Sequence, residues 1–197
     1  MRIRTFVLAV AVISSCGLQM RSQASGAPSS PPVGTKEDPA KAVDELMSSL
    51  ESQVVGAAKA MPADKYSFAP AQGIFAAGQT TQFDTVRTFV AQVNHLAQAN
   101  YFFFAWSGIK PDRDVKVIGS IATRDEAVAA LEASFVYAHK AIATITPENA
   151  FVTIKPIDGF STRTTIAAFA VAHGNDHYGQ MVEYLRMNGI VPPASAK

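Results

Sequence analysis

Three of the four histidines have the residue type and the positions of a metal site. His173 and His177 are four residues apart, so on a helix their rings lie one turn apart on the same face and can bind one ion. That face is mainly apolar and is expected to point inward, since it also carries Ile166, Phe169, Gln180 and Tyr184. Buried imidazoles need polar partners or a metal, because an unpaired buried polar group costs about 2 kcal/mol or more. His95 would supply a third ligand from a second helix, where Ala91 and Ala99 leave room for an ion.

The same pattern also fits histidines that are simply hydrogen-bonded in a helical core. An HxxxH pair is a weak signal by itself, and a single histidine such as His95 is weaker. His139 lies beside Lys140 at the edge of an apolar stripe, so we expect it at the surface or boundary and not at the metal. Three imidazoles suit Zn²⁺, Ni²⁺, Fe²⁺ or Co²⁺ without selecting among them. No carboxylate has the Glu-x-x-His spacing of a di-iron bundle, which argues against oxygen-activating chemistry.

A three-histidine centre leaves at least one coordination position open, where an ion can lower the pKa of water or bind a thiolate. Either reaction needs a general base, for which the candidates beside the ligands are Asp176, Tyr178 and Glu183. Asp176 could instead orient a neighbouring ring or be a solvated carboxylate. Asn94 and Asn100 are open to the same two interpretations. The sequence therefore assigns no catalytic residue.

An aromatic run, from Tyr101 to Trp106, follows His95 on the same predicted helix. Phe102 and Trp106 fall on the side of the helix that carries His95. The run could form the wall of an apolar substrate pocket, while core packing or a dimer face would use the same residues.

The composition restricts the classes of protein to which the chain can belong. It has 197 residues, of which 48% are hydrophobic and 17% charged, which is enough apolar material for a core. The formal net charge is +1 and lysine and arginine do not cluster, which argues against a nucleic-acid partner. The single cysteine, Cys16, excludes an internal disulfide framework and a cysteine-rich zinc motif.

Residues 1–16 have the pattern of an export signal, with Arg2 and Arg4 before the apolar segment 6–13. That segment is too short to span a membrane, because a spanning helix needs about 20 residues. Cys16 directly follows the segment, which favours a lipoprotein whose cysteine carries a lipid anchor. Ordinary cleavage near Ala24 is the alternative. Both interpretations predict an exported protein, either periplasmic or anchored to the membrane.

The rest of the chain is predicted to be a flexible linker followed by one helical domain. Residues 17–37 are rich in serine, glycine and proline and contain little to bury, so they predict the linker. The folded domain is expected to span residues 38–193. Hydrophobic spacings of three and four residues predict four helices, over residues 39–59, 84–106, 123–144 and 162–188.

The predicted helix ends rest on capping signals. Asp38 precedes a proline, Thr123 and Glu126 form the pattern of a capping box, and Gly189 is a C-terminal stop. Residues 150–160 contain a proline and a glycine and are expected to form a loop with at most a short extended stretch. The predicted fold is all-α, a four-helix bundle.

Three segments resemble the DinB/YfiT-like superfamily: residues 173–193, which carry the most specific motif, residues 95–100 and residues 61–70. The resemblance covers about residues 38–193. It implies an up-down-down-up four-helix bundle, often a homodimer, with one divalent metal held by three histidines near an open cleft. All three ligand positions are occupied here, by His95, His173 and His177.

The resemblance leaves two kinds of function open. Some relatives transfer a low-molecular-weight thiol to an electrophile and others are hydrolases, which implies a metal-dependent hydrolase or a thiol or group transferase. The alternative is a non-catalytic, metal-stabilised binding module. The predicted export departs from the cytosolic thiol transferases, because bacillithiol and mycothiol are scarce outside the membrane. No residue identifies the small-molecule substrate.

Overall fold

The computed structural model describes residues 31–196. The predicted signal peptide, Cys16 and most of the predicted linker lie outside these residues. From Lys36 onward the described chain forms one compact unit. Within the described part, no helix combines the length and the apolar character that crossing a membrane requires.

The compact unit is mostly helical, with four long α-helices, one short α-helix and one two-stranded sheet among its described residues. In chain order the elements are α1 (Pro39–Ala60), α2 (Phe89–Phe103), α3 (Val115–Ile118), α4 (Arg124–Ile142), β1 (Thr153–Ile157), β2 (Phe160–Thr162) and α5 (Arg163–Met187). The prediction of four long helices is confirmed, whereas α3 and the sheet were not predicted.

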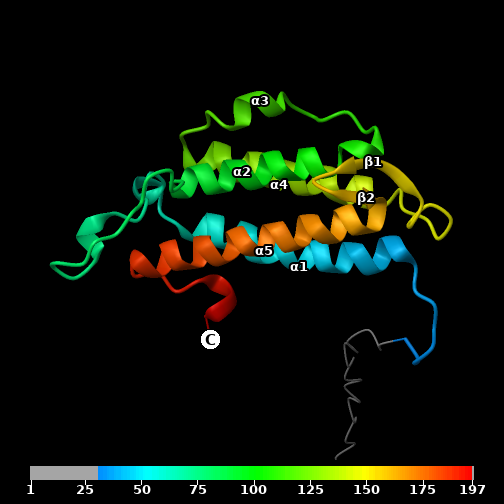
Figure 1. Cartoon of the computed structure of the whole chain (residues 1–197), viewed down its shortest axis with the longest axis horizontal. Helices are drawn as coiled ribbons and strands as arrows, with labels where there is room; N and C mark the ends of the chain where they lie inside the picture. Colours follow the sequence, from blue (N-terminus) through cyan, green and yellow to red (C-terminus); the bar gives the residue numbers. More distant parts are fainter. Residues whose placement is uncertain (1–30, 197) are drawn as a thin grey trace, which may run out of the picture. The chain divides into compact units, whose positions relative to one another are not determined.

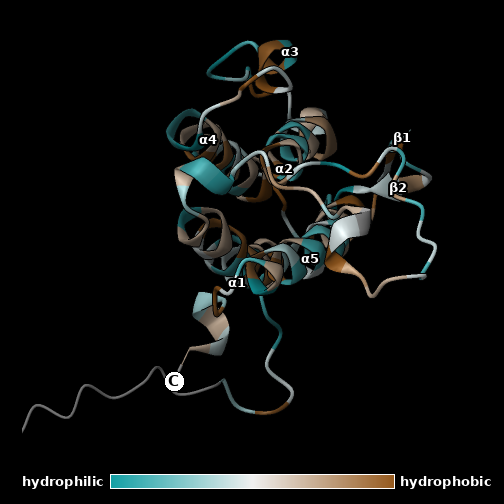
Figure 2. Ribbon diagram, turned by 90° about the vertical axis from the view of Figure 1, so that its left-hand side faces the viewer, coloured by the Kyte–Doolittle hydropathy of each residue, from teal (hydrophilic) through white to brown (hydrophobic). Residues whose placement is uncertain are grey.

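The four long helices pack side by side around a common core (Figures 1 and 2). α1 contacts α4 and α5, and α2 contacts the same two helices, so each long helix has two long neighbours. The fully buried side chains between them come from all four helices and include Val54, Phe89, Leu131, Ile166 and Met181. α3 lies outside this group, against α2.

The predicted start of α1 and both predicted ends of α5 are formed as expected. The Asp38 carboxylate accepts a hydrogen bond from the Lys41 backbone N–H at 3.1 Å and caps α1. Thr162 caps α5, in a reciprocal pair with Thr165. Gly189 has a φ of +74°, the left-handed conformation that glycine adopts at helix ends without steric cost.

The start of α2 lies five residues later than predicted, at Phe89. Thr88 is the N-cap, and its hydroxyl accepts a hydrogen bond from the Ala91 N–H at 3.3 Å. The first two N–H groups of the helix, which have no partner within it, bind the carbonyl oxygens of Phe68 and Tyr66 at 2.8 Å each. These contacts from a distant loop fix the helix start, and periodicity along the chain cannot detect them.

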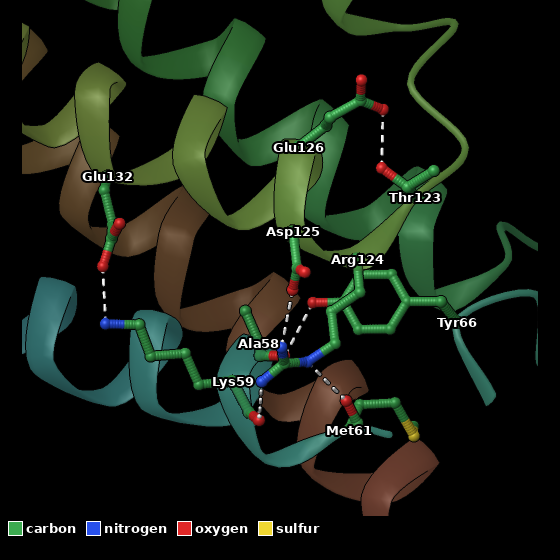
Figure 3. Close-up of polar contacts among 9 residues, drawn as sticks. All are labelled: Ala58, Lys59, Met61, Tyr66, Thr123, Arg124, Asp125, Glu126 and Glu132. Carbon is green, nitrogen blue, oxygen red and sulfur yellow. Dashed lines mark hydrogen bonds and ion pairs between the residues drawn. The ribbon is translucent and has the colours of Figure 1, made fainter. Parts of the chain in front are cut away.

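The N-terminus of α4 is joined to the C-terminus of α1 by side chains that Figure 3 shows. The predicted capping box is wrong: the Thr123 hydroxyl donates to the Glu126 carboxylate at 2.6 Å and makes no cap hydrogen bond to the backbone. The Arg124 guanidinium instead donates to the carbonyl oxygens of Lys59 at 2.8 Å and Met61 at 3.2 Å. Arg124 therefore satisfies carbonyls that the end of α1 leaves without helical partners.

The segment predicted as a loop over residues 150–160 contains a β-hairpin, so the all-α prediction needs this correction. Ile157 of β1 pairs with Phe160 of β2, and only Asp158 and Gly159 connect them. These two residues have φ values of +50° and +86°. A two-residue turn with both φ values positive matches the right-handed twist of paired strands, and Asp-Gly is a preferred sequence for it. The hairpin contacts α5 near its start.

Candidate metal centre

His95, His173 and His177 converge between α2 and α5. One ring nitrogen from each lies within 4.8 Å of the other two, the only such group of three potential metal ligands among residues 31–196. The Nε2 atoms of His95 and His173 are 3.2 Å apart. The His177 ring centroid is 4.6 Å from each of the other two. Three residues that are up to 82 positions apart in the sequence therefore form one compact group.

The helices place the three rings by simple geometry. The four-residue spacing puts His173 and His177 on the face of α5 that contacts α2. His95 lies in the middle of α2 and meets them across this helix contact. His177 is buried and the other two rings are half-buried, so the group has a closed side and a side that opens toward solvent.

The donor set and its spacing fit a first-row divalent metal ion. Two imidazole nitrogens bound tetrahedrally to one ion at ~2.0–2.1 Å are about 3.3 Å apart. The observed separation of 3.2 Å between the Nε2 atoms of His95 and His173 is close to this value. Without an ion, two neutral imidazoles at this distance can share only one hydrogen bond. The three-histidine group could therefore hold a metal ion.

A chain of hydrogen bonds fixes the orientation of the buried ligand. His177 Nδ1 donates to Gln92 Oε1 at 2.8 Å, Gln92 Nε2 donates to Gln180 Oε1 at 2.6 Å, and Gln180 Nε2 donates to Asp176 Oδ2 at 3.1 Å. The chain ends on a carboxylate, which only accepts, so every donor and acceptor along it is determined. His177 therefore carries its proton on Nδ1 and presents the Nε2 lone pair to the other histidines.

The surroundings keep all three imidazoles neutral. Burial, aided by the positive charge of Arg87 and by the neighbouring histidine His173, lowers the pKa of His95 to about 4. Burial and the other two histidines lower the pKa of His177 to about 4 as well. Burial also lowers the pKa of His173, although the carboxylates of Asp176 and Asp158 oppose that shift. Neutral imidazole is the form that binds a metal.

Two phenylalanines, Phe103 and Phe169, pack against one of the α5 ligands, His173. The Phe103 ring meets the ring of His173 edge to face, with centroids 5.2 Å apart, and meets Phe169 at 5.4 Å. Phe160 of the hairpin stacks on Phe169 at 4.5 Å. The aromatic contacts thus connect the hairpin to His173 through residues of α2 and α5.

The other candidate residues lie in different surroundings. Asp176 is exposed and ends the hydrogen-bond chain, while Tyr178 is half-buried and Glu183 is exposed. Asn94 donates to the Ile121 carbonyl at 2.8 Å, and Asn100 donates to the Ser134 hydroxyl at 3.0 Å. Both asparagines therefore bind neighbouring elements, and neither has a hydrogen bond to a histidine.

Gln92 and Asp158 belong to the site but were not among the predicted residues. Gln92 is three residues before His95 and so shares a face of α2, and a polar residue on a buried face is a signal that could have found it. Asp158 lines a surface cavity together with His95 and His173. The signal in the sequence that could have found Asp158 is the Asp-Gly pair between Ile157 and Phe160, which indicates a hairpin turn.

His139, which was expected at the boundary, lies apart from the centre on α4. Its Nδ1 and Nε2 atoms contact the carboxylates of Asp44 and Glu51 on α1, at 2.5 and 3.1 Å. Burial alone would lower its pKa, but the hydrogen bonds and charges of these two carboxylates outweigh burial and raise it. Lys41 lines a surface cavity together with Asp44 and His139, and Lys140 directly follows His139 in the chain, so two positive charges are nearby.

We expect His139 to stabilise the fold more at pH 6 than at pH 8.5. A raised pKa in the folded state adds stability that is fully present below the unfolded value of about 6.5 and is lost as the pH rises through the folded value. The measurement is urea unfolding of the wild type and His139→Gln with chelator present, where the other histidines titrate alike in both proteins. The stability difference should fall by about 1 kcal/mol between the two pH values. A difference that stays constant or grows with pH would contradict the ion pairs.

Comparison with known protein families identifies the family of the chain. The sequence profile of the DinB superfamily matches residues 46–181, which is more than half of the chain and includes all three histidines. No curated protein gives a significant match to the chain.

Proposed function

The chain belongs to the DinB superfamily, and on that premise we propose that it binds one divalent metal ion through His95, His173 and His177. We propose that its four long helices form the up-down-down-up bundle that the resemblance implies. The function that the site supports best is metal-dependent hydrolysis, or transfer of a thiol or another group, on a small molecule.

The observation that carries this proposal is the convergence of three neutral imidazoles with their nitrogens within 4.8 Å of one another. A structural metal site in a core is closed, whereas a catalytic one keeps an accessible position. His95 and His173 line a cavity of about 280 Å³ on the surface, which supports an open site. This openness favours catalysis over a purely structural, metal-stabilised module.

The surrounding residues have distinct tasks in such a reaction. A bound divalent ion supplies Lewis-acid chemistry. Gln92 holds the His177 ring with Nε2 toward the centre. Phe103 and Phe169 keep water from one side of His173. Asp158 lines the open side, where its carboxylate can accept a hydrogen bond or a proton from the reacting group.

We also propose that the protein is exported, as a periplasmic protein or as a lipoprotein anchored through Cys16, and that it forms homodimers. The export signal pattern of residues 1–16 supports the first proposal, and the superfamily resemblance supports the second.

Elemental analysis of untagged protein tests the metal site. We expect about one equivalent of a divalent transition metal per chain in the wild type and almost none in His95→Ala or His177→Ala, because two imidazoles hold an ion far more weakly than three. His139→Ala is the matched control and should keep its metal, since His139 binds only carboxylates of α1. Metal retained by both ligand variants would refute the centre.

A panel of esters, amides and thiol–electrophile pairs then separates an enzyme from a binding module. Turnover that disappears with chelator and returns with metal supports the enzyme. Stoichiometric metal without turnover on any class of substrate favours the metal-stabilised module.

A further inference from the structure

The opening of the metal centre continues into a longer groove between α2 and the hairpin. Its first part is the cavity that His95 and His173 line. A second cavity of about 470 Å³ lies beyond it, with Phe102, Trp106 and Ile154 in its walls. Phe102 and Asp158 line both cavities, so the two cavities adjoin at these residues, and together they are called the groove below. The larger volume is in the usual range for sites that bind small molecules.

The walls of the groove are apolar and held in place. Phe102 exposes 57% of its surface, and its ring is held edge to face against Phe103, with centroids 5.4 Å apart. The hairpin that forms the opposite wall is fixed by its tight turn and by the stacking of Phe160 on Phe169. The groove is therefore a preformed apolar surface that begins at the histidines.

The charges along the groove differ between its two ends. Asp158 lies where the two cavities meet and so places a negative charge near the histidines. Lys155 lines only the cavity farther from them. Arg163 does not line the cavity, but its guanidinium carbon is 5.7 Å from the centroid of the Trp106 ring and its Nη1 donates to the Asn149 carbonyl at 3.2 Å. It therefore holds the Trp106 ring and contributes only a more distant positive charge.

We propose that the groove binds an anionic amphiphile, a small molecule with an apolar or aromatic body and a negative charge at its far end. The body lies between Phe102 and the hairpin, and the negative group faces Lys155. The uncharged end then reaches the histidines past Asp158, whose carboxylate repels the anionic end and so sets the orientation. The inference that this molecule is the substrate rests on the proposed function. The inference that the groove binds such a molecule does not rest on it.

Two matched fluorescent probes test the groove on the full chain after metal removal. The anionic probe is 1-anilinonaphthalene-8-sulfonate, and N-phenyl-1-naphthylamine is the same molecule without the sulfonate. Trp106 is the only tryptophan of the chain, so energy transfer from it shows that the probe binds in its neighbourhood, and the groove variants locate the probe more closely. We expect saturable binding of the anionic probe with loss of Trp106 emission.

Variants separate the apolar from the charged contribution. Phe102→Ser should weaken both probes about tenfold, because it removes apolar contact area from the groove. Lys155→Glu should weaken only the anionic probe, by about fivefold, and Asp158→Asn should strengthen it by about twofold. Phe151→Ser and Lys116→Glu, at exposed positions that do not line the groove, should change neither probe. Near-UV circular dichroism of every variant should match the wild type.

Three results would overturn the proposal: no energy transfer from Trp106, probe binding that Phe102→Ser does not change, or an equal loss of both probes in Lys155→Glu. The metal centre is tested separately. Probe binding by a chain that, as purified, contains no metal by elemental analysis would leave the groove and remove the metal function. Metal binding without probe binding would leave the metal function and remove the groove as a binding site.

Discussion

Replacement of Gln92 by leucine is expected to weaken metal binding by about 10- to 100-fold, the usual effect of removing a residue that orients a metal ligand. Gln92 is buried and accepts the Nδ1 proton of His177 at 2.8 Å. Leucine fills a similar volume but accepts no hydrogen bond. The His177 ring would then be free to rotate or to change tautomer, and a buried N–H would lose its partner, which costs about 1–3 kcal/mol.

Gln92→Glu separates orientation from packing. A carboxylate also accepts the Nδ1 proton and makes the opposite nitrogen a better ligand, so this variant should bind metal at least as tightly as the wild type. The measurement is competition for Zn²⁺ or Co²⁺ against a chelator of known affinity. Asn100→Leu is the control, since it removes another buried amide of α2 whose partner is Ser134. Equal metal affinities in Gln92→Leu and Asn100→Leu would mean that Gln92 only fills space.

The chain's own periodicity predicts most of the helical framework. The helix ends at Asp38, Thr162 and Gly189 are predictable because their causes are local. The first two side chains accept hydrogen bonds from backbone N–H groups three residues later, and the glycine ends its helix through its own left-handed conformation.

On α1, a spacing of three and four residues joins Val43, Leu46 and Leu50, which predicts that Leu46 is buried. Leu46 is 53% exposed, and Met47 is buried instead. Met47 has the same spacing to Val43 and Leu50 and lies within the buried stripe, whereas Leu46 lies at its border.

The parts that were not predicted depend on contacts between distant segments. The start of α2 depends on carbonyl groups of Tyr66 and Phe68. The α4 terminus depends on Arg124, which binds carbonyls of a helix more than 60 residues away. At the metal centre, the four-residue spacing of His173 and His177 predicts that they share a helix face. The position of His95 beside them depends on the packing of α2 against α5, which the spacing does not predict. The partner of His177, Gln92, is 85 residues away, so no local pattern joins them.

Gly174, between two of the histidine ligands, is expected to be intolerant of even one methyl group. A Cβ atom at this position would lie 2.4 Å from Cδ2 of Leu50 on α1. The Leu50 side chain therefore packs directly on the backbone of α5 at Gly174. In a buried core such overpacking costs about 1–3 kcal/mol. The gain in helix propensity from Gly to Ala is about 1 kcal/mol, so Gly174→Ala should destabilise the fold by up to about 2 kcal/mol.

Gly179 is a matched control on the same helix. Nothing lies within 4 Å of a Cβ atom there, so Gly179→Ala should stabilise the protein by up to about 1 kcal/mol. Urea unfolding of both variants gives opposite signs if the contact with Leu50 determines the result. In a Leu50→Ala background the space is free, and Gly174→Ala should become stabilising, with a coupling of about 2 kcal/mol.

The same variants connect the core to the metal centre. Gly174 directly follows His173 and is three residues before His177, so a shift of α5 away from α1 moves both ligands relative to His95. Metal affinity should therefore fall in Gly174→Ala and recover in the double variant with Leu50→Ala, while Gly179→Ala leaves it unchanged. The contrary result is that Gly174→Ala and Gly179→Ala have equal stability and equal metal affinity. That result would show that the α1–α5 contact does not position the ligands.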